Sequence, residues 1–174
     1  MRARPKDAFF VGLAILVLQL FAYADYFTDD SYIYARFASN LVEHGELVFN
    51  PGERIHAATS PLWALLLAGF VAAGIPVVAG TKILGGLCAF GAALRVWRIG
   101  IRRFGPGIWS VILFLQFVSE PWFIRWSASG METPLAVLLL MLALEAGLRP
   151  IDEVDWTRVG WSLGLMPLVR PEAT

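Results

Sequence analysis

Cysteine is almost absent from this chain, and its scarcity excludes two classes of protein at the outset. Cys88 is the only cysteine among 174 residues, so the chain cannot form an internal disulfide. It lies inside an apolar run and gives no sign of a cysteine-based metal site or redox centre. Net charge is also lacking, because 14 Lys and Arg balance 14 Asp and Glu. A chain with this balance gives no indication of a nucleic-acid partner.

Charge of either sign is scarce as well. Only 16% of the residues are charged, whereas soluble proteins average about 25%. Hydrophobic residues make up 57% of the chain, and 7 Trp and 12 Phe are among them. This composition excludes an ordinary soluble domain. It predicts an all-α fold, a polytopic membrane helix bundle.

The apolar segments define the expected spans. We predict helices that cross the bilayer at residues 8–27, 77–97, 106–124 and 133–148, with a further, incomplete span at 160–174. Basic residues precede the first span and keep the N-terminus in the cytoplasm, namely Arg2, Arg4 and Lys6. A cleaved signal peptide is the alternative, because Ala22-Tyr23-Ala24 matches a cleavage pattern. Both alternatives place the residues that follow on the outer side.

Residues 61–73 can be interpreted in two ways, and charge decides between them. The segment is short for a span and typical of an interfacial helix, although a crossing over residues 61–79 is the alternative. With an interfacial helix, most Lys and Arg fall on the cytoplasmic side, and those outside are Arg36, Arg54 and Arg125. A crossing would put most of them outside. The positive-inside rule therefore favours the interfacial helix and a multi-pass protein of the plasma (inner) membrane.

This topology places residues 25–60 and 125–132 on the outer face. The first of these segments contains an apolar stripe that predicts an amphipathic helix over residues 30–44, with Gly45 as its stop. Such a helix, between the first two spans, is expected to lie on the outer membrane surface.

Two adjacent acids, Asp29 and Asp30, open this amphipathic helix. A helix cap needs one short polar residue, and Thr28 alone would serve. Ionised carboxylates at a membrane face suit the removal of a proton from an acceptor hydroxyl, or the binding of a divalent cation. Arg36 shares a face with Asp29, roughly 10 Å further along, which leaves room for a sugar between a base and a phosphate-binding cation. Capping and solvation of a surface loop is the alternative interpretation.

Three sequence motifs occur in order along the chain. The first extends from Asp29-Asp30-Ser31-Tyr32-Ile33 to Thr59-Ser60-Pro61-Leu62-Trp63, the second is Ser129-Gly130-Met131-Glu132-Thr133-Pro134, and the third is Leu168-Val169-Arg170-Pro171-Glu172. Together they resemble GT-C-type integral-membrane glycosyltransferases, nearest to bacterial enzymes similar to the mycobacterial terminal β-arabinofuranosyltransferase. The resemblance covers nearly the whole chain but only the N-terminal part of such an enzyme, so we expect a fragment. His56-Ala57-Ala58 departs from the family pattern, where many relatives have Glu-Gly-Tyr.

The resemblance implies transfer of a sugar from a polyprenyl-phosphate donor to a cell-envelope glycan, lipid or protein acceptor at the outer face. It implies catalytic roles for Asp29, Asp30 and Glu132. A leaving phosphate needs cationic stabilisation, and the expected phosphate-binding residues are Arg36, Arg54, His56 and Arg125. The cofactor to consider is a divalent metal, with Asp29 and Asp30 as its candidate ligands.

Two other functions fit parts of the sequence. A transporter or flippase component would use outer acids to bind ions, but transporters usually place charges at mid-membrane, where these spans have almost none. A non-catalytic, truncated remnant would keep every motif, and the short length of the chain favours it. The sequence therefore leaves the glycosyltransferase as the leading hypothesis for the family, with activity of this chain alone as an open question.

Overall fold

The computed structural model describes residues 5–53 and 59–173, and within these ranges the regular secondary structure is helical, with loops between the helices. No strand occurs there, which confirms the expected all-α class. The α-helices are α1 (Pro5–Ala22), α2 (Asp29–His44), α3 (Pro61–Ala72), α4 (Val77–Phe104), α5 (Ile108–Val118), α6 (Pro121–Ala128), α7 (Thr133–Gly147) and α8 (Trp156–Leu165). Three short 3-10 helices follow α7 or α8, namely η1 (Ile151–Glu153), η2 (Met166–Leu168) and η3 (Pro171–Ala173).

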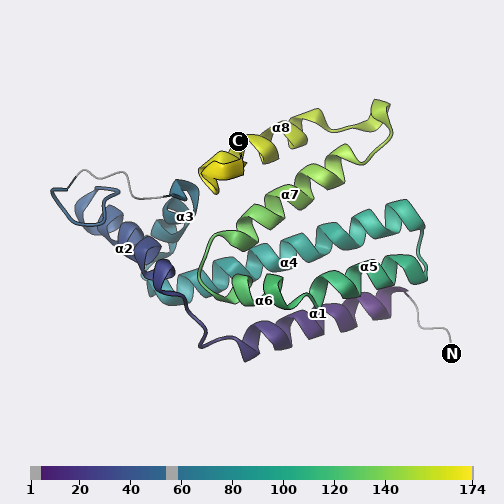
Figure 1. Ribbon diagram of the computed structural model, residues 1–174, viewed down its shortest axis with the longest axis horizontal. Helices are drawn as coiled ribbons and strands as arrows, with labels where there is room; N and C mark the ends of the chain where they lie inside the picture. Colours follow the sequence, from purple (N-terminus) through teal and green to yellow (C-terminus); the bar gives the residue numbers. More distant parts are fainter. Residues whose placement is uncertain (1–4, 54–58, 174) are drawn as a thin grey trace.

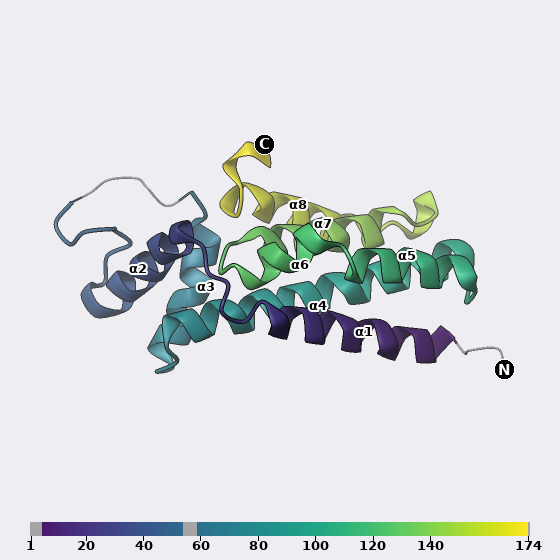
Figure 2. The ribbon, with the colours of Figure 1, turned by 60° about the horizontal axis from the view of Figure 1, so that its bottom comes forward.

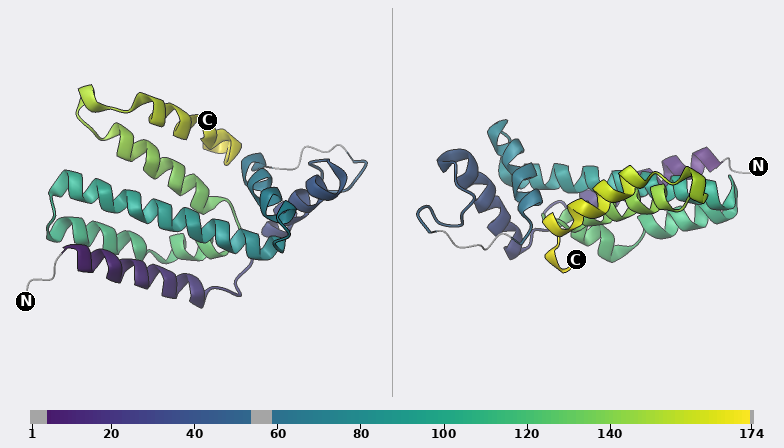
Figure 3. Two further views of the ribbon diagram at one scale, coloured as in Figure 1. Left: turned by 180° about the vertical axis from the view of Figure 1, so that it is seen from behind. Right: turned by 90° about the horizontal axis from the view of Figure 1, so that it is seen from above.

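The longer helices lie side by side in a row with α4 near its middle (Figure 1). α4 packs against α7 on one side and α5 on the other, while α8 covers α7 and α1 lies along α5 and α6. α4 and α7 run in the same direction, so their C-terminal ends lie at the same end of the row (Figure 1). α2 and α3 pack against each other and project from the opposite end, as all the views show (Figure 2, Figure 3).

The amphipathic helix predicted over residues 30–44 is present as α2. Thr28 occupies the cap position with extended backbone, and Gly45 ends the helix in the left-handed conformation at φ 72°. The amide of Gly45 donates to the carbonyl oxygen of Leu41 at 3.1 Å, a common way to satisfy the last turn of a helix. The buried face of α2 includes Tyr34, Phe37 and Ala38, as the apolar stripe predicted. Local sequence signals therefore fix both ends and the orientation of this helix.

The apolar segment expected to form one helix over residues 106–124 is divided into α5 and α6. The break falls at Ser119 and Glu120, directly before Pro121. Proline has no amide hydrogen and its ring excludes the helical carbonyl bond, so a new helix begins there. The side chain of Glu120 accepts a hydrogen bond from the amide of Phe123 and caps that new helix. The result is a short α6 that continues from α5 toward the end of the row where α2 and α3 lie (Figure 1).

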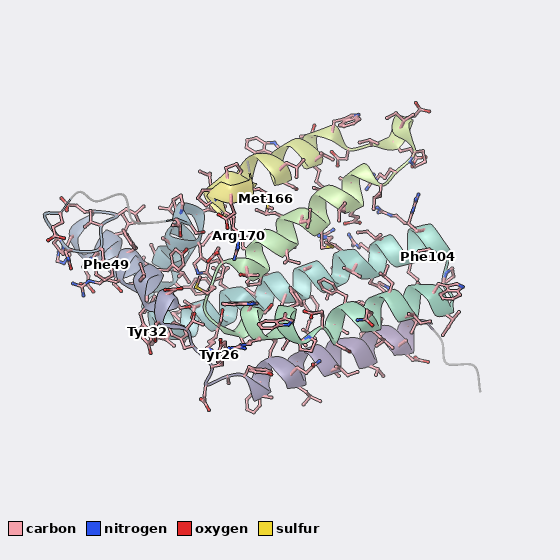
Figure 4. The ribbon with its side chains drawn as sticks, viewed as in Figure 1. Tyr26, Tyr32, Phe49, Phe104, Met166 and Arg170 are labelled. Atoms are coloured by element: carbon pink, nitrogen blue, oxygen red, sulfur yellow. The ribbon has the colours of Figure 1, made fainter. Side chains whose placement is uncertain are left out.

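The C-terminal part also differs from the expected continuous helix from residue 160. α8 begins earlier, at Trp156, and ends at Leu165, where η2 and then η3 follow. Pro167 and Pro171 interrupt regular helical bonding in this stretch and account for the short 3-10 turns. These turns fold Arg170 back toward the beginning of α7 (Figure 4).

Within the described residues, one helix, α4, is long and apolar enough to cross a membrane, judged by length and composition. Shorter apolar helices are α3, α5 and α7. The predicted interfacial helix at residues 61–73 corresponds to α3, which packs against α2 and buries Trp63 and Leu67 completely. The other predicted spans stay predictions.

Among the described residues, the two largest groups of buried side chains join the helices. One group lies where α2, α3, α4, α7 and the C-terminal turns meet, and it includes Trp63, Leu67, Leu135, Leu139 and Val169. The other joins α1, α4, α5 and α6 through Leu16, Ala93, Phe114, Val118 and Ile124. α4 and α6 approach so closely that a Cβ atom on Gly85 would lie 2.4 Å from the carbonyl oxygen of Ser127. The lack of a side chain at Gly85 therefore allows the end of α6 to pack directly against α4.

Candidate active site around Glu132

The turn between α6 and α7 is tied directly to α2 and α3. The carbonyl oxygen of Ser129 accepts hydrogen bonds from the amide of Thr28 at 3.2 Å and the hydroxyl of Ser31 at 2.8 Å. The indole nitrogen of Trp63 donates to the carbonyl oxygen of Gly130 at 3.0 Å. The first and second sequence motifs, about 100 positions apart, are thereby joined through backbone carbonyl groups.

Gly130 makes this turn possible in two ways. Its φ of 90° lies in the left-handed region, where residues with a side chain are strained. A Cβ atom there would also meet Phe27 at 2.5 Å and Ser31 at 3.0 Å. The turn therefore needs a glycine for its backbone conformation and for its close approach to α2, and it delivers Glu132 to the start of α7.

Glu132 is a buried acid that pairs with Arg170 of the C-terminal segment. It is 5% exposed, and one of its oxygens lies 3.2 Å from Nη2 of Arg170. Arg170 also donates to Oγ1 of Thr133 at 3.0 Å and pairs with Glu172 at 3.2 Å (Figure 4). Because Arg170 is shared between two carboxylates and is partly exposed, it only partly neutralises the buried charge of Glu132.

Tyr34 lies against Glu132 from the α2 side. Its hydroxyl shares a hydrogen bond of 2.7 Å with Oγ1 of Thr59. Burial raises the pKa of Tyr34 above its ordinary value, and the negative charge of Glu132 raises it further, although the bond to Thr59 opposes this. The two side chains are therefore electrostatically coupled.

The environment of Glu132 favours its protonated form. Burial raises the pKa of the carboxyl above its ordinary value, and the Arg170 charge and the Tyr34 hydroxyl offset only part of the effect. Within the described part of the chain, Oε2 of Glu132 is buried with no hydrogen-bond partner. A carboxyl group in this state can hold a proton and release it when a cation or donor approaches.

A cavity of about 260 Å³ lies next to Met131, the residue before Glu132. Its lining comprises Asp30, Ile33, Tyr34, Thr59 and Met131. Asp30 is exposed and stands at this cavity, one helical turn before the buried Tyr34. We call the group formed by Asp30, Tyr34, Thr59, Glu132 and Arg170 the Glu132 site.

Asp29 does not belong to the Glu132 site, although it is the neighbour of Asp30. It lines a separate, open groove of about 570 Å³, together with Arg36 and other residues of α2. Successive residues of a helix point about 100° apart, so the two acids face different hollows. The prediction that Asp29 and Arg36 share a face is confirmed, but the acid pair is divided between two places.

The two predicted phosphate-binding arginines that the structure describes are engaged away from Glu132. Arg36 donates to the carbonyl oxygen of Phe49 at 2.7 Å and to Asn50 at 3.2 Å, and stacks on the Phe49 ring at 5.2 Å (Figure 4). Arg125 donates to the Tyr26 hydroxyl at 2.9 Å and lies over that ring at 4.8 Å. Both side chains hold loops in place.

Two further predicted phosphate-binding residues, Arg54 and His56, lie outside the described residues. Among the residues that are described, no three His, Cys, Asp or Glu side chains gather so that they could hold a metal ion. The divalent metal predicted at Asp29 and Asp30 therefore has no ligand set to support it here, because the two acids face different hollows.

Sequence reasoning did not assign Arg170, Tyr34 or Thr59 to the site. Arg170 belongs to the third motif and Thr59 to the first, so their presence in motifs was a usable signal. Tyr34 follows Asp30 at the spacing that places two side chains on one face of a helix, which was a second signal. The chain matches no protein-family model, no curated protein and no solved structure. Its function is therefore argued from the geometry of the site.

Proposed function

We propose that this chain contributes to a membrane glycosyltransferase that moves a sugar from a polyprenyl-phosphate donor to a glycan, lipid or protein acceptor of the cell envelope. The observation that carries the proposal is the Glu132 site, where residues from all three motifs meet. Asp30 and Thr59 come from the first motif, Glu132 from the second and Arg170 from the third. Segments that are distant in sequence come together here: Asp30 and Thr59 line the cavity, and the pair of Glu132 and Arg170 directly follows Met131, which also lines it.

The side chains match the needs of sugar transfer. Asp30 at the cavity takes the proton from an acceptor hydroxyl, whose oxygen forms a bond to the anomeric carbon of the donor sugar. The bond between that carbon and the phosphate oxygen breaks, and the polyprenyl phosphate leaves with the electron pair. Arg170 supplies positive charge for the leaving phosphate, and a protonated Glu132 releases Arg170 from their pair to do so.

The cavity volume suits one sugar ring and little more. The space of about 260 Å³ is bordered by polar groups on Asp30, Tyr34 and Thr59 and by the apolar side chains of Ile33 and Met131. A mixed lining of this kind binds the hydroxyl groups and the apolar face of a sugar together. The donor lipid would approach from the side of the bundle, along its apolar helices.

The membrane arrangement that goes with this function is a multi-pass bundle in the plasma membrane with a cytoplasmic N-terminus. Two observations support it. The arginines of α4 lie near its C-terminal end, and the Glu132 site lies at the other end of the row, beside α2 and α3. With the arginine end in the cytoplasm, the Glu132 site faces outward, where lipid-linked donor sugars are presented.

The decisive experiment compares the two neighbouring aspartates. Membranes that contain the full chain are given polyprenyl-phosphate sugars of several kinds, and release of polyprenyl phosphate is measured. We expect Asp30→Asn to lower the rate about 10²–10⁴-fold, since it removes a general base. Asp29→Asn is the matched control, because it removes the same charge from the same helix turn but faces the other groove, and we expect it to stay within about threefold of wild type.

The outcomes separate the alternatives. Equal rates in wild type and both variants would end the assignment of Asp30. The chain could also bind the donors, with binding weakened by Arg170→Gln, and yet release no polyprenyl phosphate from any of them. This result would favour the non-catalytic remnant with an intact site. Binding that is the same in wild type and Arg170→Gln would remove the phosphate role of Arg170 as well.

The orientation has its own test. Gly130 cannot carry a labelling cysteine without strain, so the exposed positions Glu46 and Arg103 are used in a Cys88→Ser background. We expect an impermeant thiol reagent added outside intact cells to label Glu46→Cys and not Arg103→Cys. The reverse pattern would overturn the proposed topology.

A further inference from the structure

A second buried acid, Glu145, lies near the C-terminal end of α7 and is surrounded by arginines of α4. Its side chain is completely buried. Arg95 reaches one carboxylate oxygen at 2.9 Å, while Arg102 and Arg98 reach the other at 3.2 and 3.8 Å. Arg102 also donates to the backbone carbonyl of Glu145 at 3.4 Å. We call Glu145 with these three arginines the Glu145 cluster.

The spacing of the arginines along α4 explains why one carboxylate can meet all of them. Positions 95, 98 and 102 recur at three- and four-residue intervals, so the side chains lie on the face of α4 that packs against α7. The carboxylate of Glu145 pairs with the arginines on this face and holds their guanidinium groups in a fixed arrangement. The proposed function makes no use of this cluster, which lies roughly 20 Å from Glu132 along α7.

The cluster carries more positive charge than Glu145 can neutralise. Three guanidinium groups face one carboxylate, and each guanidinium has five N–H donors. The side chains of Arg98 and Arg102 are 48% and 45% exposed, so their remaining donors are open to a ligand. Two exposed acids on the turn after α7, Asp152 and Glu153, lie at the same end of the row and reduce the excess of positive charge. The exposed Arg103 and the partly buried Arg149 increase it.

The surroundings of the cluster indicate what kind of anion it takes. It lies near the end of the apolar helix α4, whose last residue is the exposed Phe104 (Figure 4). The exposed Ile108 and Trp109 open α5 at the same end of the row. Exposed aromatic and aliphatic side chains beside arginines are typical of the boundary between lipid tails and headgroups. A free phosphate would use the guanidinium groups but not these apolar neighbours.

We propose that the Glu145 cluster binds the phosphate group of an anionic phospholipid of the cytoplasmic leaflet, with Arg98 and Arg102 as the direct donors. Glu145 and Arg95 are positioning residues that hold the two donors toward the lipid. The site rests on the membrane arrangement proposed above but not on sugar transfer. The partner is the bilayer itself, in which negative lipids are the ligands of basic clusters at helix ends.

The test measures binding of spin-labelled phosphatidylglycerol to the full chain in vesicles of phosphatidylcholine. We expect preference for phosphatidylglycerol over spin-labelled phosphatidylcholine in the wild type. Each arginine near the surface contributes roughly a fivefold factor, so Arg98→Gln with Arg102→Gln is expected to weaken the preference about 25-fold. The same two positions changed to Lys keep the charge and are expected to retain most of it.

The matched control removes two positive charges elsewhere at the same end. Arg103→Gln with Arg158→Gln leaves the Glu145 cluster intact, because Arg158 pairs with Asp155 and not with Glu145. We expect this double variant to lose clearly less preference than the roughly 25-fold expected for Arg98→Gln with Arg102→Gln, because its arginines lie outside the cluster. An equal loss in both double variants would show diffuse surface charge and overturn the proposal.

The remaining outcomes are also decisive. A chain that inserts into phosphatidylcholine vesicles but binds both labelled lipids equally overturns the lipid site alone. A chain that does not insert overturns the membrane arrangement and the lipid site together. Competition by inorganic phosphate at concentrations similar to the lipid would assign a phosphate site instead. Unfolding temperatures in phosphatidylcholine that match wild type show that the Gln variants are folded.

Discussion

The two buried glutamates of α7 have opposite surroundings. Glu132 begins the helix and pairs with one arginine, Arg170, among the described residues, and that arginine is shared with Glu172. Glu145 lies near the other end of α7 and pairs with three arginines of α4. In the described structure each acid keeps one buried oxygen without a hydrogen bond, Oε2 of Glu132 and Oε1 of Glu145. The Glu145 oxygen nevertheless lies 3.2 Å from Arg102 and 3.8 Å from Arg98, so both Glu145 oxygens face arginines.

The difference shows how one residue type serves two purposes in one helix. An acid with too little positive charge beside it retains a proton readily and suits chemistry. An acid with an excess of positive charge beside it fastens helices together and leaves cationic groups for another anion. The predictions below test whether the two ends of α7 differ in this way.

The largest effect is expected from removing the carboxylate charge of Glu145. Glu145→Gln leaves Arg95 mostly buried and without its ionic partner, and breaking a buried pair in this way costs about 3–5 kcal/mol of folding free energy. Glu132→Gln is the matched variant at the other end and is expected to cost about 1 kcal/mol, because Arg170 keeps Glu172. Unfolding in one detergent measures both. Equal losses would remove the contrast.

A backbone change is expected to affect the Glu132 end next. Gly130→Ala introduces a side chain at φ 90° and 2.5 Å from Phe27, so we expect a loss of about 2 kcal/mol. Gly52→Ala is the control, since Gly52 also has a positive φ, at 86°, but open space around it, and about 1 kcal/mol is expected there. A Gly130→Ala variant no less stable than Gly52→Ala would show that the turn adapts.

The pH dependence of stability is expected to report on Glu132. Its pKa is raised above the ordinary value of 4.5, so the folded chain binds this proton more tightly than the unfolded chain. The resulting contribution to stability is complete below about pH 4.5 and is lost as the pH rises through the raised value. Unfolding free energies over this range in wild type and Glu132→Gln isolate the effect. Identical pH profiles would contradict the raised pKa.

The smallest effect concerns Tyr34. Tyr34→Phe removes the hydrogen bond between the Tyr34 hydroxyl and Thr59, and it is expected to lower the free energy of unfolding by about 1 kcal/mol or less. Because this hydroxyl helps to lower the pKa of Glu132, the pH profile assigned to Glu132 is expected to move upward. Tyr32→Phe, an exposed position of the same helix, is expected to leave the profile unchanged. A downward movement in Tyr34→Phe would contradict the coupling.

Features with local causes could be predicted from the sequence. The ends of α2 follow from Thr28 and Gly45, and its buried face follows from the apolar stripe. α3 was predicted to within one residue, because Pro61 begins it and Gly74 follows it closely. Hydropathy alone did not reveal the break between α5 and α6, since an apolar run hides the effect of Pro121 on backbone hydrogen bonds.

The site could be predicted only in part, for a physical reason. Glu132 and Asp30 stood out as acids next to apolar segments, and both belong to the Glu132 site. The identity of the cation depended on how the C-terminal turns fold over α7, which no local pattern records. Arg36 and Arg125 were predicted to bind phosphate because of their expected side of the membrane. In the structure, both instead form hydrogen bonds with nearby groups of their own loops.

The bond between Ser31 and the Ser129 carbonyl also has a consequence for the order of folding. It joins positions 98 residues apart, and the Glu132–Arg170 pair brings in a third, later stretch. Closing such long loops carries an entropy cost, so contacts of this kind form after the local helices do. We expect helices that are neighbours in sequence, such as α4 and α5 or α7 and α8, to associate first and the cavity to be completed last. A nascent chain therefore carries Asp30 and Glu132 before it has the geometry that brings them together.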